Sequence, residues 1–93
     1  MEQKQTVEVL KALADDTRLA IVRNLAQANQ PVTSCAIVCA CASLESLSQP
    51  AASHHFAKLV KAGVVREQKQ GTRKVYSLAT DALASIGVDA SKL

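Results

Sequence analysis

The sequence predicts one mainly α-helical domain, residues 1–93, in which a β-hairpin follows the helices. Two patterns support this class. Apolar residues recur at helical spacing over the first two thirds of the chain, and residues 64–78 alternate around a turn signal at 69–72. The composition agrees, because 93 residues suit one domain and a hydrophobic fraction of 48% favours a globular fold. Only 2% of the residues are aromatic, so aliphatic side chains must supply the core.

The first two helices are predicted from apolar spacing and from a cap. The first helix, residues 3–13, has an apolar stripe that includes Val7 and Leu10. Asp15 or Asp16 suits the N-cap of a second helix, because a short carboxylate side chain accepts hydrogen bonds from otherwise unpaired N–H groups. The expected buried face of the second helix consists of Leu19, Val22, Leu25 and Ala26.

Two more helices are predicted after a break at residues 29–31. Thr33 or Ser34 can cap a third helix, which consists of small and apolar residues. Ser48 can cap a fourth helix, with Pro50 in its first turn, where a missing N–H has no cost. Gly63 suits the left-handed position that ends this helix. The expected buried face of the fourth helix is Ala52, Phe56, Leu59 and Val60.

A hairpin and a short helix complete the predicted order of elements. Strands are expected over 64–68 and 73–78, and the last helix over about 82–86. Helices, then a hairpin, then a terminal helix is the order of a winged helix-turn-helix domain. Its two parts would be residues 34–62, the helix-turn-helix, and residues 64–78, the wing.

Positive charge is concentrated in one part of the chain. The whole chain has a net charge of +3. Residues 48–78 hold six basic residues and one acidic residue, a net charge of +5, and the segments on either side are each at −1. A basic segment on a nearly neutral body is typical of a protein that binds nucleic acid, although a solvated surface would explain the charge alone.

The predicted fourth helix begins with residue types that suit the major groove of DNA. Glutamine can make a bidentate contact with adenine, and serine can contact base edges or phosphates. Such contacts come from the N-terminal part of a recognition helix. The expected residues are Ser48, Gln49, Ser53, His54 and His55. Phosphate contacts are expected further along this helix and in the wing, from Lys58, Lys61, Lys69, Arg73 and Lys74.

The sequence gives little support for other classes of protein. It has no Gly-rich phosphate loop, no carboxylate pair at helical spacing and no evident nucleophile–base pair, so we expect no enzymatic activity. The N-terminus is polar and no apolar run approaches the length of a membrane span, which predicts a cytoplasmic protein without a membrane partner. A winged domain that binds another protein is the alternative class, because fold alone does not determine function.

Four stretches of the chain follow one another in a familiar order and spacing. They are LKALADDTRL at 10–19, SQPAASHHF at 48–56, LVKAGVV at 59–65 and GTRKVYSL at 71–78. Together they resemble the ArsR/SmtB family of winged-helix repressors, which are arsenic- and metal-responsive regulators. The resemblance implies a homodimer that binds double-stranded operator DNA, represses its own operon and releases the DNA on sensing a signal.

The same resemblance assigns parts of the chain to the two interfaces. Residues 3–13 and 80–93 would form the dimer contact. The apolar side chains expected there are Val7, Val9, Leu83, Ile86 and Leu93. Gln49, Ser53 and His55 match the DNA-contacting positions of the family's recognition helix, and Arg73 matches its wing.

Cys35, Cys39 and Cys41 lie within seven residues, on the predicted helix before the recognition helix. Arsenite-sensing members of the family carry cysteines on that helix, and trivalent arsenic, copper(I), zinc and cadmium all accept thiolate ligands. The expected effector is therefore arsenite or another thiophilic metal ion, and folding should require no cofactor. The spacing is C-x3-C-x-C, not the C-x-C-x2-C of the arsenite-sensing pattern. On an ideal helix Cys41 lies about 200° from Cys39, so one ion could bind all three only if the helix unwinds.

Two other roles for the cysteines stay open. Cys35 and Cys39 are four residues apart and could form a strained disulfide or polysulfide link, which is the labile, regulatory kind. Alternatively the three cysteines pack as small buried hydrophobic residues, since the surrounding segment is apolar.

Overall fold

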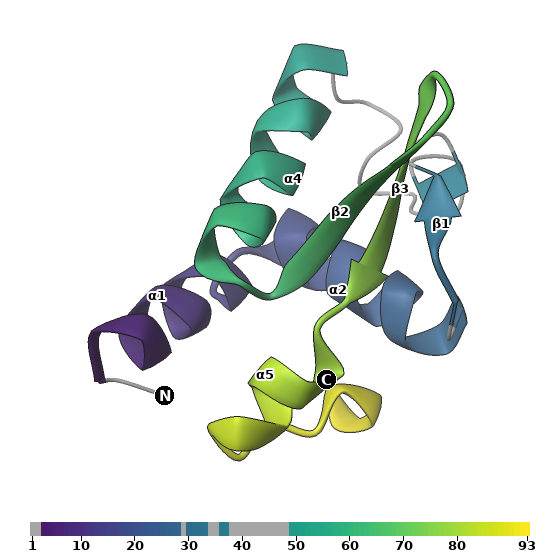
Figure 1. The fold of residues 1–93 in the computed structure, drawn as a ribbon. Helices are drawn as coiled ribbons and strands as arrows, with labels where there is room; N and C mark the ends of the chain where they lie inside the picture. The colour runs from purple at the N-terminus through teal and green to yellow at the C-terminus, as the bar shows by residue number, and fades with distance from the viewer. Residues whose placement is uncertain (1–2, 29, 34–35, 38–48) are drawn as a thin grey trace.

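A computed structural model of the chain describes residues 3–28, 30–33, 36–37 and 49–93. The helical elements are α1 (Gln3–Leu13), α2 (Asp16–Ala28), α4 (Gln49–Ala62), α5 (Thr80–Ser85) and the 3-10 helix η2 (Ala90–Lys92), and the strands are β1 (Val32–Thr33), β2 (Val65–Gln70) and β3 (Arg73–Leu78). The start of α4 and the tip of the β2–β3 hairpin lie at the same end of the molecule, and α5 lies at the opposite end (Figure 1). This arrangement confirms the predicted winged helix-turn-helix class.

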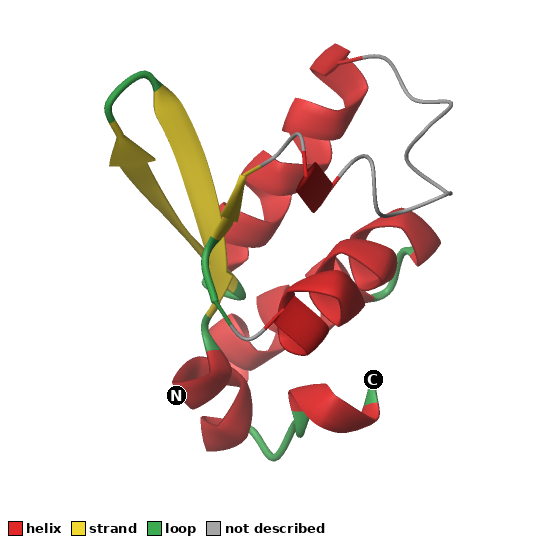
Figure 2. Cartoon of the chain, turned by 90° about the vertical axis from the view of Figure 1, so that its right-hand side faces the viewer, coloured by secondary structure: helices red, strands yellow, loops and turns green. Residues whose placement is uncertain are grey.

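The sheet has three antiparallel strands in the order β1-β3-β2, and it lies to one side of the helices (Figure 2). The register pairs Gln70 with Arg73, so the turn contains only Gly71 and Thr72. Gly71 has a φ of +65°, which suits such a tight hairpin turn. The predicted four-residue turn at 69–72 is therefore wrong by two residues. Strand β1 was not predicted, because a strand of two residues is too short to show an alternating pattern and is defined only by its pairing with β3.

Side chains from α1, α2, α4, α5 and the base of the wing form one core. Its only two aromatic rings, Phe56 of α4 and Tyr76 of β3, stack with centroids 4.7 Å apart and an interplanar angle of 16°. Burial raises the pKa of the Tyr76 hydroxyl above its usual value. The stack packs β3 of the wing against α4, because two rings in contact within a closely packed interior have little room to move.

The caps around α4 and α2 agree with the sequence pattern. Gly63 has a φ of +84°, and the N–H groups of Gly63 and Val64 donate to the carbonyls of Val60 and Leu59, 3.0 and 3.1 Å away. This pair of hydrogen bonds is the Schellman ending expected of a left-handed glycine. At the start of α2, Asp15 Oδ2 accepts a hydrogen bond from the Arg18 N–H at 3.0 Å, as an N-cap does.

The apolar stripe that the sequence predicts on α1 is not the side that packs into the core. Val9 and Ala12 are buried, whereas Val7 and Leu10 are 42% and 50% exposed. The helix has two apolar stripes, and the chain itself covers only one of them. Val9 and Leu83 are each 1% exposed in the core of this single chain, so they are not available to a partner as the dimer prediction required.

Helix α2 is rotated slightly from its predicted orientation. Ile21, Val22 and Leu25 are buried, whereas Leu19 and Ala26 are half-buried. In α4 the predicted face is confirmed, with Val60 packed at its margin.

The predicted third helix lies mostly outside the described residues. Ala36 and Ile37 are helical, and Thr33 Oγ1 accepts a hydrogen bond from the Ala36 N–H at 3.3 Å, as expected of a cap. Cys35, Cys39, Cys41 and Ser48 fall outside the described part of the chain. Across the described ranges, no helix is long and apolar enough to cross a bilayer.

Candidate nucleic-acid interface

The outward side of α4 is polar and exposed. Ser53, His54 and Lys58 are all exposed on it, and Lys61 is exposed near its end. The core-facing side carries Phe56 and the rest of the apolar face, so burial fixes which side of α4 remains available. Gln49 is the first residue of α4. A helix held in this way can enter a major groove with its polar side first.

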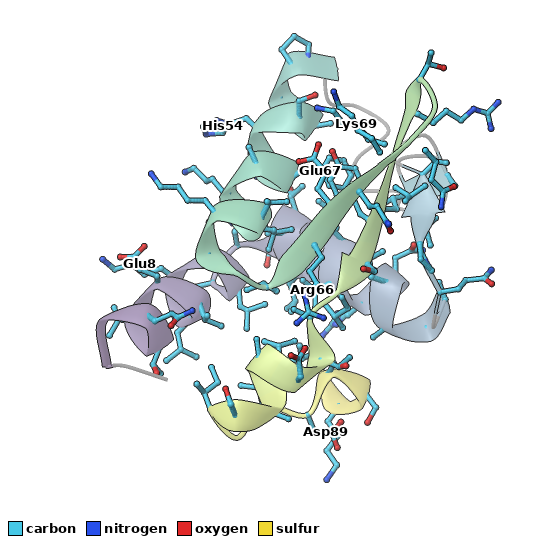
Figure 3. The ribbon with its side chains drawn as sticks, in the orientation of Figure 1. Glu8, His54, Arg66, Glu67, Lys69 and Asp89 are labelled. Atoms are coloured by element: carbon cyan, nitrogen blue, oxygen red, sulfur yellow. The ribbon has the colours of Figure 1, made fainter. Side chains whose placement is uncertain are left out.

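The wing adds cations beside this helix. Lys69 and Arg73 are exposed close to the Gly71 turn, and both are free of ion pairs with other described residues. Lys69 belongs to the side of β2 that faces α4, whereas His54 points away from the hairpin (Figure 3). Cations on both α4 and the hairpin can hold phosphates on either side of one groove.

Lys74 lies in the wing with a partner of its own. Its Nζ is 3.1 Å from Glu67 Oε1 on the neighbouring strand. The hydrogen bond that Lys74 donates to the Glu67 carboxylate raises the pKa of Lys74 above its usual value. Glu67 thus neutralises part of the positive charge of the wing. Lys74 could contact a phosphate only if it also kept its bond to Glu67 or broke it.

Arg66 is one of the basic residues of the 48–78 segment, and the structure pairs it with an acidic residue. Its Nη2 donates to both carboxylate oxygens of Asp81, at 2.7 and 2.8 Å. This hydrogen bond lowers the pKa of Asp81 below its usual value. The pair ties the base of β2 to α5, a contact that spans fifteen residues and that charge counting along the sequence does not detect.

His55 is turned toward the body of the protein and is half-buried. Its Nδ1 lies 3.4 Å from Arg18 Nη1 and 3.9 Å from Asp15 Oδ2, both at the start of α2. The hydrogen bond from the Arg18 backbone N–H lowers the pKa of Asp15 below its usual value, and the charge of the Arg18 guanidinium acts in the same direction. The neighbouring rings of His54 and His55 thus lie in different surroundings.

Metal ligands are not assembled in the described part of the chain. No group of three His, Cys, Asp or Glu side chains within it is arranged to hold an ion. The proposed thiol ligands, Cys35, Cys39 and Cys41, lie outside it.

Comparison with known proteins agrees with the geometry. Residues 13–68 match the family described as "Helix-turn-helix domain". An uncharacterised helix-turn-helix transcriptional regulator of Methanocaldococcus jannaschii is 34% identical over 85 residues, which cover 89% of this chain and 88% of that protein. These relatives are transcriptional regulators, and the fold is a DNA-binding one, not that of an enzyme.

Two solved structures have the same architecture. The homodimeric winged helix-turn-helix DNA-binding domain of Mb0332 from Mycobacterium bovis, a possible ArsR-family regulator, is 31% identical with a TM-score of 0.73, over 89% of this chain and 71% of that one. A "possible transcriptional regulator for arsenical resistance" is 25% identical with a TM-score of 0.70, over 91% of this chain and 90% of that one.

Proposed function

Because the chain belongs to the ArsR family of winged helix-turn-helix transcriptional regulators, we propose that it is a homodimeric repressor that leaves its operator on sensing a thiol-reactive signal. The observation that carries the proposal is the exposed polar side of α4 beside exposed wing cations, at one end of the molecule. In this arrangement Gln49, Ser53 and His54 contact bases or nearby phosphates. Lys58, Lys69 and Arg73 contact phosphates.

The homodimer is proposed from the outer stripe of α1. Val7 and Leu10 are the exposed large hydrophobic side chains of the described residues. A second copy of the same helix is the partner that would cover them, as in the family to which the chain belongs, and Mb0332 is itself homodimeric. A dimer would present two copies of α4 to two half-sites of an operator, one helical turn apart.

The proposed signal is arsenite or another thiophilic metal ion, with Cys35, Cys39 and Cys41 as ligands. Support comes from ligand chemistry, since three closely spaced thiols offer soft donors to a soft ion, and from the similar protein named for arsenical resistance. The ion is an effector and not a folding cofactor in this proposal. The described core forms from aliphatic and aromatic side chains alone.

The DNA-binding part is tested with a double variant, Gln49→Ala with Ser53→Ala. We expect the variant to lose its preference for the DNA upstream of its own gene and to keep its weaker binding to unrelated DNA, because phosphate contacts remain. A gel-shift titration on both DNAs measures the ratio. An unchanged ratio would favour the alternative, a winged domain that binds another protein or that holds DNA without sequence preference.

The effector part is tested by adding arsenite, cadmium, zinc or hydrogen peroxide to the protein–DNA complex. Release by arsenite that each of Cys35→Ser, Cys39→Ser and Cys41→Ser weakens supports the metalloid sensor. Release by peroxide alone, lost in the first two variants, supports the disulfide switch. If all three variants respond as the wild-type chain does, the cysteines have only a structural role.

A further inference from the structure

The two adjacent histidines of α4 are in contrasting positions, although both belong to the segment that sequence similarity assigns to DNA. His54 is exposed and points away from the hairpin (Figure 3). His55 is half-buried, with 20% of its side chain exposed, and its ring lies against α2. Neighbouring helical positions point about 100° apart, and in α4 this difference leaves His54 exposed and turns His55 toward α2.

Arg18, the residue that His55 contacts, is anchored at the junction between α1 and α2. Its Nε donates to the Ala12 carbonyl at 2.8 Å, and its Nη2 lies 3.4 Å from the Lys11 carbonyl. Both acceptors belong to the last turn of α1. One guanidinium therefore joins the end of α1, the start of α2 and the middle of α4.

The contact with Arg18 favours one tautomer of the neutral His55 ring. A guanidinium only donates hydrogen bonds, so Nδ1 accepts from Arg18 Nη1 in the tautomer that carries its proton on Nε2. The carboxylate of Asp15, 3.9 Å from Nδ1, completes the set of charged groups around the ring.

We propose that His55 is a positioning residue for the recognition helix: through Arg18 it fixes α4 to the end of α1, while Ser53 and His54 face the DNA. This inference rests on the proposed DNA-binding function. It differs from the assignment by sequence similarity, in which His55 itself contacts DNA. Because α1 is the proposed dimer helix, the link passes from the dimer contact to the helix that enters the groove. The orientation of two such helices sets the half-site spacing that a dimer can bind.

The two roles of His55 predict different energetics in a double-mutant cycle. A side chain that acts only through Arg18 loses its effect once Arg18 is replaced, so the single effects do not add. A side chain that contacts DNA directly keeps its effect whatever occupies position 18. The exposed neighbour His54 provides the matched control, since it makes no described contact with Arg18.

Fluorescence anisotropy measures the operator affinity of Arg18→Met, His55→Ala and their double variant. The control cycle consists of Arg18→Met, His54→Ala and their double variant. The expected result is a loss of about tenfold for each of Arg18→Met and His55→Ala, and no further loss in their double variant. His54→Ala should add fully to Arg18→Met. His55→Gln should recover part of the affinity, because its amide oxygen can accept from Arg18.

Base preference separates a positioning role from a direct base contact, and circular dichroism separates both from a loss of folding. On operators with single base-pair changes, His55→Ala should weaken binding uniformly, whereas a base contact would be lost at one position only. Circular dichroism in urea establishes that each variant is folded under the binding conditions. For the unmodified chain, the ¹⁵N spectrum of the imidazoles should show an unprotonated Nδ1 and a protonated Nε2 on neutral His55.

Additive effects of Arg18→Met and His55→Ala, a loss of preference at a single base pair, or the opposite tautomer would each overturn this assignment while leaving DNA binding intact. Failure of the wild-type chain to bind any DNA would overturn the proposed function, and the positioning role with it. The two failures are therefore distinct.

Discussion

The outer surfaces of α4 and α1 differ in chemistry. The uncovered side of α4 is polar, and the hairpin tip, which Lys69 and Arg73 flank, lies at the end of the molecule where α4 begins. The uncovered stripe of α1 is apolar, with Val7 and Leu10 about half exposed. A polar, cationic surface is well hydrated and binds an anionic partner by electrostatic attraction, so its affinity for that partner falls as the salt concentration rises. Burial of an apolar stripe is driven by the hydrophobic effect, so its affinity for a partner depends little on the salt concentration. The two proposed binding surfaces of the chain should therefore be open to separate disruption.

The largest effect is expected where the DNA-facing surface is held together. Phe56→Ala removes the ring that stacks on Tyr76 between α4 and the wing. Loss of a buried aromatic side chain should lower the free energy of unfolding by about 3–5 kcal/mol, which is a large share of the stability of a small domain. Urea denaturation followed by circular dichroism measures the change. Ser53→Ala, on the exposed side of the same helix, should stay within about 0.5 kcal/mol of the wild-type value.

A smaller effect, confined to DNA, is expected from the wing. Lys69→Glu with Arg73→Glu should weaken operator binding on the order of 100-fold and reduce the slope of log affinity against log salt by about 2, one for each phosphate contact. Anisotropy titrations at several salt concentrations measure both quantities. Lys92→Glu makes the same kind of charge change at the opposite end of the molecule and should alter the slope much less. Equal slopes for the wild-type and double-variant proteins would exclude these two cations from the interface.

The apolar stripe predicts a third, separate effect. Val7→Ser with Leu10→Ser should raise the dimer dissociation constant by tenfold or more, since burial of each such side chain contributes about 1.5–3 kcal/mol. Sedimentation equilibrium measures the constant, and its change should be the same at low and high salt. Glu8→Gln, an exposed substitution on the same helix, is the control. If the double variant has the same dimer dissociation constant as the wild-type chain, the dimer contact lies on another surface.

The smallest effect is expected at the pair that joins the wing to α5. The hydrogen bond from Arg66 holds the pKa of Asp81 below its ordinary value of 3.8. The stability that the pair contributes is therefore present above that value and is lost as the pH falls below it. Both side chains are well exposed, so the contribution is small. Urea midpoints of the wild-type chain and Arg66→Gln should differ slightly at pH 7 and converge as the pH falls below 3.8. A difference that grows in acid would contradict the pairing.

The sequence predicted elements whose signals are local. The apolar face of α4, its glycine ending at Gly63 and the cap at Asp15 all depend on neighbouring residues, and the structure confirms them. It did not predict which stripe of α1 is buried, because that depends on what packs against the helix. Strand β1 was missed for the same reason, since it is defined by its partner β3.

The candidate site was predictable in outline only. Residue type and position indicated Ser53, His54 and Lys58, and the structure places all three on the outer side of α4. The Arg66–Asp81 pair and the contact between His55 and Arg18 join residues 15 and 37 positions apart, and the Lys74–Glu67 pair crosses between the two strands of the wing. The motif around Arg18 was recognised as part of a family pattern, but a guanidinium's partners follow from the fold and not from spacing.

Sequence-specific binding by α4 is the central claim, and one titration tests it most directly. The affinity of the unmodified chain for the DNA upstream of its own gene is compared with its affinity for a scrambled duplex of the same length and composition, over a range of salt. The predicted result is binding to the upstream DNA that is about a thousandfold tighter or more, with both affinities falling steeply as salt rises. Equal affinity for the two duplexes, or no binding at low salt by a folded dimer, would contradict it.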